Sequence, residues 1–236
     1  MSSYEVIMKQ IFNIFPTTIY VDEVENHNTF KERFLKLYDK FDYEENDLST
    51  TVSEGQVNPL IHLEPSMDDM FKEIIRHVKS YVLDTLKFKD MFNYSITKTW
   101  ISRTRDSKEI PWHIHSTSHI SFVYYLNIPP YSHTTRFLNI ENYNSLFLGA
   151  NSHNNNDDKN MIAEFNALNC KTFFIHPQEG YVAIFPSRVS HGTECIKKDF
   201  QGERLSIVGD VNLILKEEHL LHSMGLIDEK YWKKYE

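Results

Sequence analysis

Three absences limit what this chain can be. It has only two cysteines, Cys170 and Cys195, in 236 residues, so it has no disulfide framework and a reducing cytoplasm is expected. No apolar run approaches the roughly 20 residues of a membrane span, and the first residues lack the apolar segment of a signal peptide. The sequence therefore predicts a soluble, cytoplasmic protein. Both cysteines are expected to be half-buried strand residues rather than metal ligands.

Positive charge is also scarce. Lys and Arg number 25 against 33 Asp and Glu, which gives a net charge of −8, and no basic run is present. Affinity for nucleic acid rests largely on basic residues, so direct duplex binding is not expected. The partners that remain are a small molecule or a peptide. The oligomeric state is left open.

The length fits one domain spanning residues 1–236, because β-barrels of this size are commonly single domains. We expect a helical N-terminal part at about 22–92, a β-barrel core at about 94–215 and a short C-terminal extension, 216–236. There are no internal repeats. A short strand from about Ile14 to Val21 is expected to precede the helices.

Helical periodicity is confined to the N-terminal part. Thr29 and Glu32 form a capping box that predicts the start of a first helix. A second helix is expected to start at Ser66, with Asp69 in the reciprocal capping position. Both apolar stripes are expected to pack on a sheet. They comprise Phe30, Phe34, Leu37, Tyr38 and Phe41 in the first helix, and Met70, Phe71, Ile74, Ile75, Val78, Val82 and Leu86 in the second.

From about Tyr94 the pattern changes to short β-rich segments separated by turn residues, which favours a sandwich or barrel. The fold class expected is thus α+β. The asparagine-rich stretch 139–160 is expected to be a long exposed loop, either a surface excursion or a lid. The predicted strands are Ser95–Arg103, His119–Ile128, Phe137–Ile140, Lys171–His176, Tyr181–Phe185 and Arg204–Ile214.

The histidines at 113, 115 and 191 point to a metal site. Residues i and i+2 of a strand project from the same face, so His113 and His115 can reach one point together. A third imidazole from His191, far along the chain, would complete three corners and leave other positions open. That arrangement is typical of non-haem iron oxygenases.

Six short motifs occur in an order that resembles a known family. They are Phe15-Pro16-Thr17-Thr18-Ile19-Tyr20, Trp112-His113-Ile114-His115, Ser121-Phe122-Val123-Tyr124-Tyr125-Leu126-Asn127, Pro177-Gln178-Glu179-Gly180, Phe185-Pro186-Ser187 with His191, and Arg204-Leu205-Ser206. This order resembles the iron(II)- and 2-oxoglutarate-dependent oxygenases of the prolyl-hydroxylase-like branch. More narrowly, it is similar to oxygenases of that superfamily from bacteriophages and marine bacteria, which would imply a host's cytoplasm if the gene is phage-borne. The resemblance runs from about residue 12 to about 213.

The resemblance implies a double-stranded β-helix, a jelly-roll or cupin-like barrel, with iron(II) at its mouth. Its ligands would be His113, His115 and His191. Arg204, with Ser206 and Tyr125, would hold the far carboxylate of the co-substrate 2-oxoglutarate. Dioxygen would be the oxidant, succinate and CO₂ the co-products, and ascorbate the reductant in vitro. The hydroxylated substrate is left open among a peptidyl proline, another amino acid, a nucleotide and a small metabolite.

His115 departs from the commonest pattern of the superfamily, which has Asp or Glu at this position. In the phage-like group a histidine is usual. Three neutral imidazoles leave the full 2+ charge on the metal, which favours an anionic co-substrate and also makes zinc a credible occupant. Alternatively His115 contacts only a metal-bound water, with His119 as a weaker substitute ligand.

Other interpretations stay open for the remaining residues. Arg204 suits a carboxylate because its planar guanidinium donates two parallel hydrogen bonds, but it can also form a structural ion pair. Tyr125 is expected to face the site and Tyr124 the opposite side, while Trp112 and Phe185 are expected to form walls. Two rival classes remain: a three-histidine cupin-like metal enzyme or binding module without 2-oxoglutarate, and a structural protein that keeps the fold but not the activity.

Overall fold

The computed structural model describes residues 11, 13–38, 44–45, 50–52, 60–140, 144 and 162–216. The helices are α1 His27–Leu37 and α2 Asp68–Lys79, with short 3-10 segments η2 Ile61–Leu63 and η3 Pro65–Met67 and a π-helical segment η4 Ser80–Thr85. The strands are β1 Tyr20–Glu23, β2 Glu44–Glu45, β3 Thr50–Val52, β4 Phe92–Arg105, β5 Ile120–Asn127, β6 His133–Leu138, β7 Thr172–Ile175, β8 Tyr181–Pro186, β9 His191–Cys195 and β10 Glu203–Leu215.

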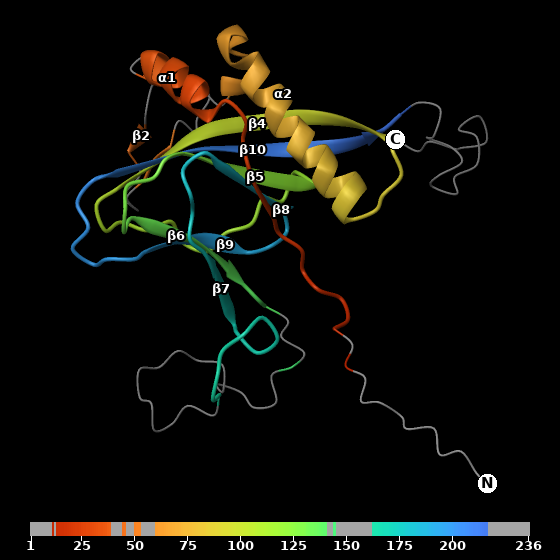
Figure 1. The fold of residues 1–236 in the computed structure, drawn as a ribbon, viewed down its shortest axis with the longest axis vertical. Helices are drawn as coiled ribbons and strands as arrows, with labels where there is room; N and C mark the ends of the chain where they lie inside the picture. The colour runs from red at the N-terminus through yellow and green to blue at the C-terminus, as the bar shows by residue number, and fades with distance from the viewer. Residues whose placement is uncertain are drawn as a thin grey trace, which may run out of the picture.

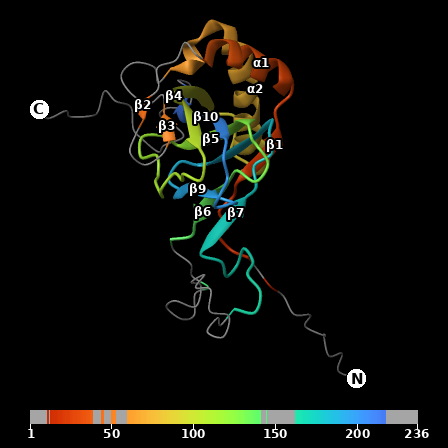
Figure 2. The same ribbon diagram turned by 90° about the vertical axis from the view of Figure 1, so that its left-hand side faces the viewer.

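The strands form two sheets. The major sheet has the order β1-β8-β5-β10-β4-β3-β2, and the minor sheet has the order β7-β6-β9. Helices α1 and α2 cover one face of the major sheet, and the minor sheet lies on the other side (Figures 1 and 2). This arrangement confirms the α+β class and the double-stranded β-helix backed by N-terminal helices.

Alternation along the strands divides the core into two layers. In β5, Phe122 and Tyr124 belong to the cluster under the helices, whereas Val123 and Tyr125 belong to the cluster between the sheets. Successive strand residues point to opposite faces, so one strand supplies both layers. The layer between the sheets is the smaller of the two.

The N-terminal predictions need correction. The first strand is β1, which begins only at Tyr20, and Ile14 and Phe15 are 71% and 90% exposed. Helix α1 begins at His27, two residues before the predicted capping residue, and its N-cap Asn26 takes the left-handed conformation without a side-chain hydrogen bond. Phe30 and Phe34 are buried as predicted. Phe41 lies outside the described residues.

The second helix is also built differently from the prediction. Ser66 lies in the 3-10 segment, where its hydroxyl donates to Glu64 (2.8 Å), and α2 starts at Asp68. The helical course continues through the π-helical segment Ser80–Thr85. Leu86, predicted as core, follows this segment and is 37% exposed. The other predicted apolar positions of this helix pack against the sheet as buried or partly buried residues.

Most predicted strands of the barrel have counterparts in the structure. One of them has different bounds, and one observed strand was not predicted. The third begins earlier, at His133, because its first residues are buried polar side chains that lack the apolar signature of a strand. Strand β9 was not predicted at all, although it begins with His191. Cys195 ends β9, Cys170 lies outside the strands, and both are free thiols.

Two predictions fall largely or wholly on residues that the structure does not describe. Of the asparagine-rich stretch 139–160, only 139, 140 and 144 are described, and residues 217–236 of the C-terminal extension are not. Among the helices of the described part, none is long and apolar enough to cross a membrane.

Candidate active site

The two neighbouring histidines lie outside the regular strands. His113 and His115 belong to the connection between β4 and β5, so the prediction of a strand here was wrong. His113 instead forms an isolated antiparallel bridge with His191, in which each backbone N–H donates to the other's carbonyl (2.9 and 3.0 Å). This single bridge fixes the connecting segment against the start of β9.

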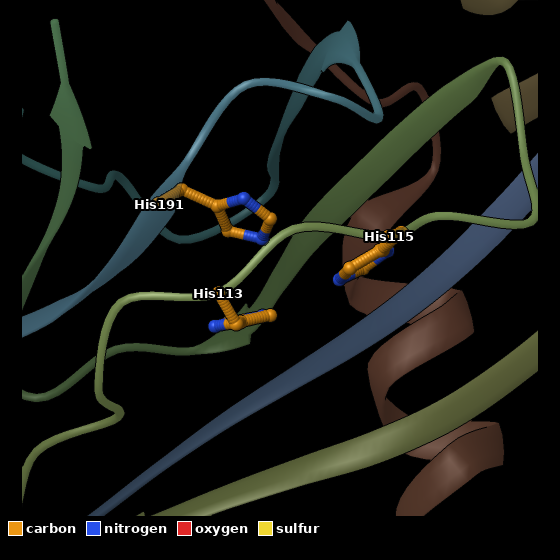
Figure 3. Close-up of side chains that lie close together, drawn as sticks. All are labelled: His113, His115 and His191. Atoms are coloured by element: carbon orange, nitrogen blue, oxygen red, sulfur yellow. The ribbon is translucent and has the colours of Figure 1, made fainter. Parts of the chain in front are cut away.

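The three rings gather at one point (Figure 3). One ligand nitrogen from each of His113, His115 and His191 lies within 4.8 Å of the others. The ring centroids are 5.3 Å apart for His113 and His115, 4.3 Å for His113 and His191, and 5.0 Å for His115 and His191. Three imidazoles at this spacing can hold one metal ion.

Hydrogen bonds define which nitrogen each ring can offer. In all three rings Nδ1 contacts an oxygen acceptor, so Nδ1 is the donor and Nε2 is the nitrogen left for a metal ion. Outer hydrogen bonds of this kind orient metal-ligating histidines. The acceptors are the carbonyls of Pro111 (2.9 Å, His113) and Val189 (2.9 Å, His191) and the carboxylate of Asp210 (2.6 Å, His115).

Burial keeps the third imidazole uncharged. His191 is 4% exposed, and burial, reinforced by the neighbouring His113, lowers the pKa of His191 to about 3. A histidine must be neutral to bind a metal, so this ring is ready to bind at neutral pH. The donor set of this structure therefore fits a divalent metal ion.

A buried cation lies in the same cavity. Arg204 on β10 is 1% exposed, and its Nη2 donates a long hydrogen bond to Thr135 Oγ1 (3.4 Å). Its guanidinium lies 5.5 Å from the centroid of the Tyr125 ring, and the Tyr125 hydroxyl hydrogen-bonds Thr135 (2.9 Å). Within the described part of the chain Arg204 has no carboxylate partner, which argues against the structural ion pair.

Other polar atoms around Arg204 are also unpaired. Nε of Arg204 and the hydroxyls of Ser102, Thr104 and Ser206 are buried without a hydrogen-bond partner in the described residues. Burying a charge or a hydroxyl without a partner is costly, so such a group is expected to meet a ligand. A carboxylate would satisfy the charge of Arg204.

His133 lies close to this arginine and stays uncharged. Its ring is fully buried, and Nε2 donates to the carbonyl of Lys108 (2.5 Å). Burial, reinforced by the positive charge of Arg204, lowers the pKa of His133 to about 4. At neutral pH His133 therefore adds no second positive charge beside Arg204.

The buried state of His133 predicts a pH dependence of stability. Between its unfolded pKa of 6.5 and its folded pKa of about 4, only the unfolded chain takes up the proton. The contribution to stability is complete above pH 6.5 and is lost as the pH falls toward 4, by about 1–3 kcal/mol. Urea unfolding of metal-free protein at pH 7 and pH 4.5 should show a smaller difference for His133→Asn than for wild type. Equal differences would contradict the assignment.

One cavity of about 440 Å³ joins the histidines to Arg204. Trp100, Ile114 and Lys98 contribute to its wall. Its volume lies within the range of about 300–1,000 Å³ that is usual for ligand pockets. The cavity therefore places a metal-binding corner and an anion-binding corner in one space.

The remaining predicted residues are spread around this cavity. Ser206 is fully buried on β10, and Phe185 lies between the sheets with its ring centroid 4.7 Å from that of His191. Trp112 is 38% exposed and stacks under Arg136 outside the cavity. His119 is not part of the three-histidine cluster; its Nδ1 accepts a hydrogen bond from the backbone of Leu213 (3.0 Å).

Sequence reasoning missed Asp210 and Thr135. One side of β10 holds every second residue: Arg204, Ser206, Val208 and Asp210. The sequence spacing therefore already placed the carboxylate of Asp210 on the same side of the strand as Arg204. Thr135 gave no such signal, because it lies where the strand was placed too late. Ser121 and Ser187 belong to two of the six sequence motifs, but the sequence suggested no function for either side chain.

A family model and several solved structures are similar to this chain. Residues 98–210 match the family model described as "Putative 2OG-Fe(II) oxygenase". A search of curated proteins found no significant match. Similar solved structures share the fold at low sequence identity. A prolyl-4-hydroxylase from Pseudomonas putida is 12% identical (TM-score 0.50; 83% of this chain and 92% of that chain covered).

The second is HygX from Streptomyces hygroscopicus, with nickel, 2-oxoglutarate and hygromycin B bound. It is 13% identical (TM-score 0.53; 83% of each chain covered). The third is a prolyl hydroxylase from Trichoplax adhaerens in complex with a peptide fragment of hypoxia inducible factor. It is 13% identical (TM-score 0.51; 86% of each chain covered).

Residues 98–210 of this chain therefore resemble the 2OG-Fe(II) oxygenases, enzymes that use iron(II), 2-oxoglutarate and dioxygen. The similar solved structures, two of them prolyl hydroxylases, share this fold. The narrower similarity to phage and marine-bacterial oxygenases stays a prediction.

Proposed function

We propose that the chain, as one domain spanning residues 1–236, is a dioxygenase that hydroxylates a C–H bond of its substrate and forms succinate and CO₂ as co-products. The observation that carries the proposal is the charge of Arg204, which is buried without a carboxylate partner in the described residues, in the same cavity as three convergent histidines. A dicarboxylate that spans this cavity could bind a metal ion on the histidines at one end and neutralise the charge of Arg204 at the other.

Each corner has its own task in this proposal. His113, His115 and His191 hold iron(II) through Nε2. Arg204 binds the far carboxylate of 2-oxoglutarate by charge-assisted hydrogen bonds, and Tyr125 and Thr135 hold the guanidinium in place. Ser206 lies beside Arg204 on the same strand and supplies a hydroxyl. When bound, iron(II) and 2-oxoglutarate supply the chemistry that activates dioxygen and oxidises a C–H bond.

The protein's own part is positioning and exclusion of water. Hydrogen bonds to Nδ1 fix the histidine rings, and the buried charge of Arg204, without a carboxylate partner among the described residues, is available for an anionic ligand. A dry, preorganised site of this kind strengthens electrostatic interactions and aligns the reacting atoms. No acid or base from the protein is required.

The open side of the cavity supports a proposal about the substrate class. Ile114 is 52% exposed where it borders the cavity, so the rim there is apolar. Of the similar structures, one holds the small molecule hygromycin B and another a peptide. We propose a small molecule or a peptidyl residue such as proline as the substrate, in a cytoplasmic protein with no part in duplex binding.

A three-histidine metal protein that does not use 2-oxoglutarate is the alternative. It is favoured by the donor set itself, since three neutral imidazoles and a water also suit zinc. It gives no reason for the buried charge of Arg204, which has no carboxylate partner among the residues that the structure describes.

Turnover of the co-substrate separates the two. With iron(II), ascorbate and oxygen, the protein is expected to convert 2-oxoglutarate into succinate, slowly without its substrate and faster with it. Succinate is measured by chromatography after incubation. His191→Ala should form none, because it lacks a ligand, whereas His119→Ala should match wild type, because His119 lies outside the cluster. Absence of succinate from the iron-loaded wild type would favour the alternative.

A further inference from the structure

A buried carboxylate lies directly behind one of the three histidines. The side chain of Asp210 on β10 is 6% exposed, and that of His115 is 8% exposed. Asp210 Oδ1 accepts hydrogen bonds from His115 Nδ1 (2.6 Å) and from the hydroxyl of Ser121 (2.9 Å). The Nδ1 atoms of His113 and His191 contact backbone carbonyls instead.

Three serine hydroxyls continue the contact in one direction. Ser118 donates to Ser187 (2.8 Å), and Ser121 donates to Asp210, so the hydrogen of Ser187 is directed to Ser121 (2.8 Å). Ser121 and Ser187 are fully buried. A chain in which each hydroxyl donates toward the carboxylate strengthens every bond in it and stabilises a negative charge at its end.

We propose that Asp210 is a positioning residue of the metal centre: acting through His115, it places a negative charge directly behind one of the three ligands. This inference rests on the proposed function. All three candidate ligands are imidazoles, and Asp210 adds a buried carboxylate one residue further out.

The physical effect has two parts. The carboxylate fixes the His115 tautomer and the direction of its Nε2 lone pair, and it makes the imidazole a stronger donor. It also offsets part of the 2+ charge that three neutral imidazoles would leave on the metal. Outer-residue contacts of this kind typically change metal affinity by 10–100-fold when removed.

The first test measures metal affinity without turnover. Binding of Co(II) to metal-free protein is followed by its visible absorption in competition with a chelator. Asp210→Asn keeps an oxygen acceptor for His115 but loses the charge, and it should weaken binding by about 10–100-fold. Glu203→Gln is the matched control: it lies on the same strand, pairs with Arg105 (2.9 Å) and should bind as wild type does. An affinity of Asp210→Asn equal to that of wild type would overturn the proposal.

The same Asp210 substitution in a His115→Asp variant distinguishes an effect through His115 from a structural role of Asp210. In His115→Asp the ligand itself carries the charge and there is no imidazole for Asp210 to hold. Asp210→Asn should then change Co(II) affinity by no more than about twofold, the scatter expected of independent positions. A loss as large as in wild type would show that Asp210 acts on the fold or on the site as a whole, and the proposal would be wrong.

A third readout needs no metal. In ¹⁵N NMR spectra of the metal-free protein, Nδ1 of His115 should carry a proton directed at Asp210, and Asp210→Ala should populate the Nε2–H form. An Nε2–H tautomer in wild type would overturn the inference even if metal binding and succinate formation establish the proposed function. Conversely, wild type that binds no metal would refute both, so the two failures can be told apart.

Discussion

Replacing Arg204 by alanine is expected to weaken binding of 2-oxoglutarate to the metal-loaded protein by roughly 30-fold or more. The guanidinium is 1% exposed and has no carboxylate partner in the described part of the chain, so a bound carboxylate would be its counter-ion. Removing one member of a buried charge pair costs about 2–5 kcal/mol. Calorimetric titration of anaerobic, iron-loaded protein with 2-oxoglutarate measures the loss.

Three comparisons make this result specific. Iron affinity of Arg204→Ala should stay at the wild-type level, because Arg204 is not a ligand. Arg204→Lys should recover little, because an ammonium group lacks the planar fork that matches a carboxylate. Arg136→Ala should bind 2-oxoglutarate as wild type does, since Arg136 pairs with Glu194 (3.1 Å) and does not line the cavity. Binding that is indifferent to Arg204 would remove the case for the co-substrate.

Replacing His191 or His113 by alanine is expected to abolish stoichiometric iron binding. Wild type reconstituted anaerobically should hold about one Fe(II) per chain. Loss of one of three ligands should exceed the 10–100-fold effect of an outer residue, because a direct bond to the metal is removed. Iron is measured after desalting, and circular dichroism checks that each variant is folded.

His119→Ala is the control for this prediction. Its ring contacts the backbone of Leu213 and lies outside the cluster, so it should keep its iron. Stoichiometric iron in both His191→Ala and His113→Ala, or loss of iron in His119→Ala, would contradict the assigned ligands.

The sequence predicted the parts of the fold in which periodicity and burial agree. The apolar stripe of α2 and the alternation of β5 are examples, because each follows from one repeated requirement of burial. Strand β9 was not predicted, because it is only five residues long and its sequence has no clear alternation of apolar and polar residues. Its position depends on pairing with β6, a contact between distant parts of the chain.

The candidate site was predictable as a set of residues but not as an arrangement. His113 and His115 come together without forming a regular strand, because the backbone bridge to His191 replaces the expected ladder. The sequence could not show that Arg204 has no carboxylate partner in the described part of the chain, since this depends on which acidic side chains fail to reach it. The spacing of Asp210 from Arg204 on β10 was an available signal for its side of the strand, but its partner His115 became evident only from the contact between them.

A crystal structure of the protein with a divalent metal and 2-oxoglutarate, or its inert N-oxalyl analogue, tests the central claim most directly. We expect one metal ion bound by Nε2 of His113, His115 and His191 at about 2.1 Å, with the co-substrate's far carboxylate on Arg204. A metal ion bound elsewhere, or a co-substrate that leaves Arg204 unpaired, would contradict it.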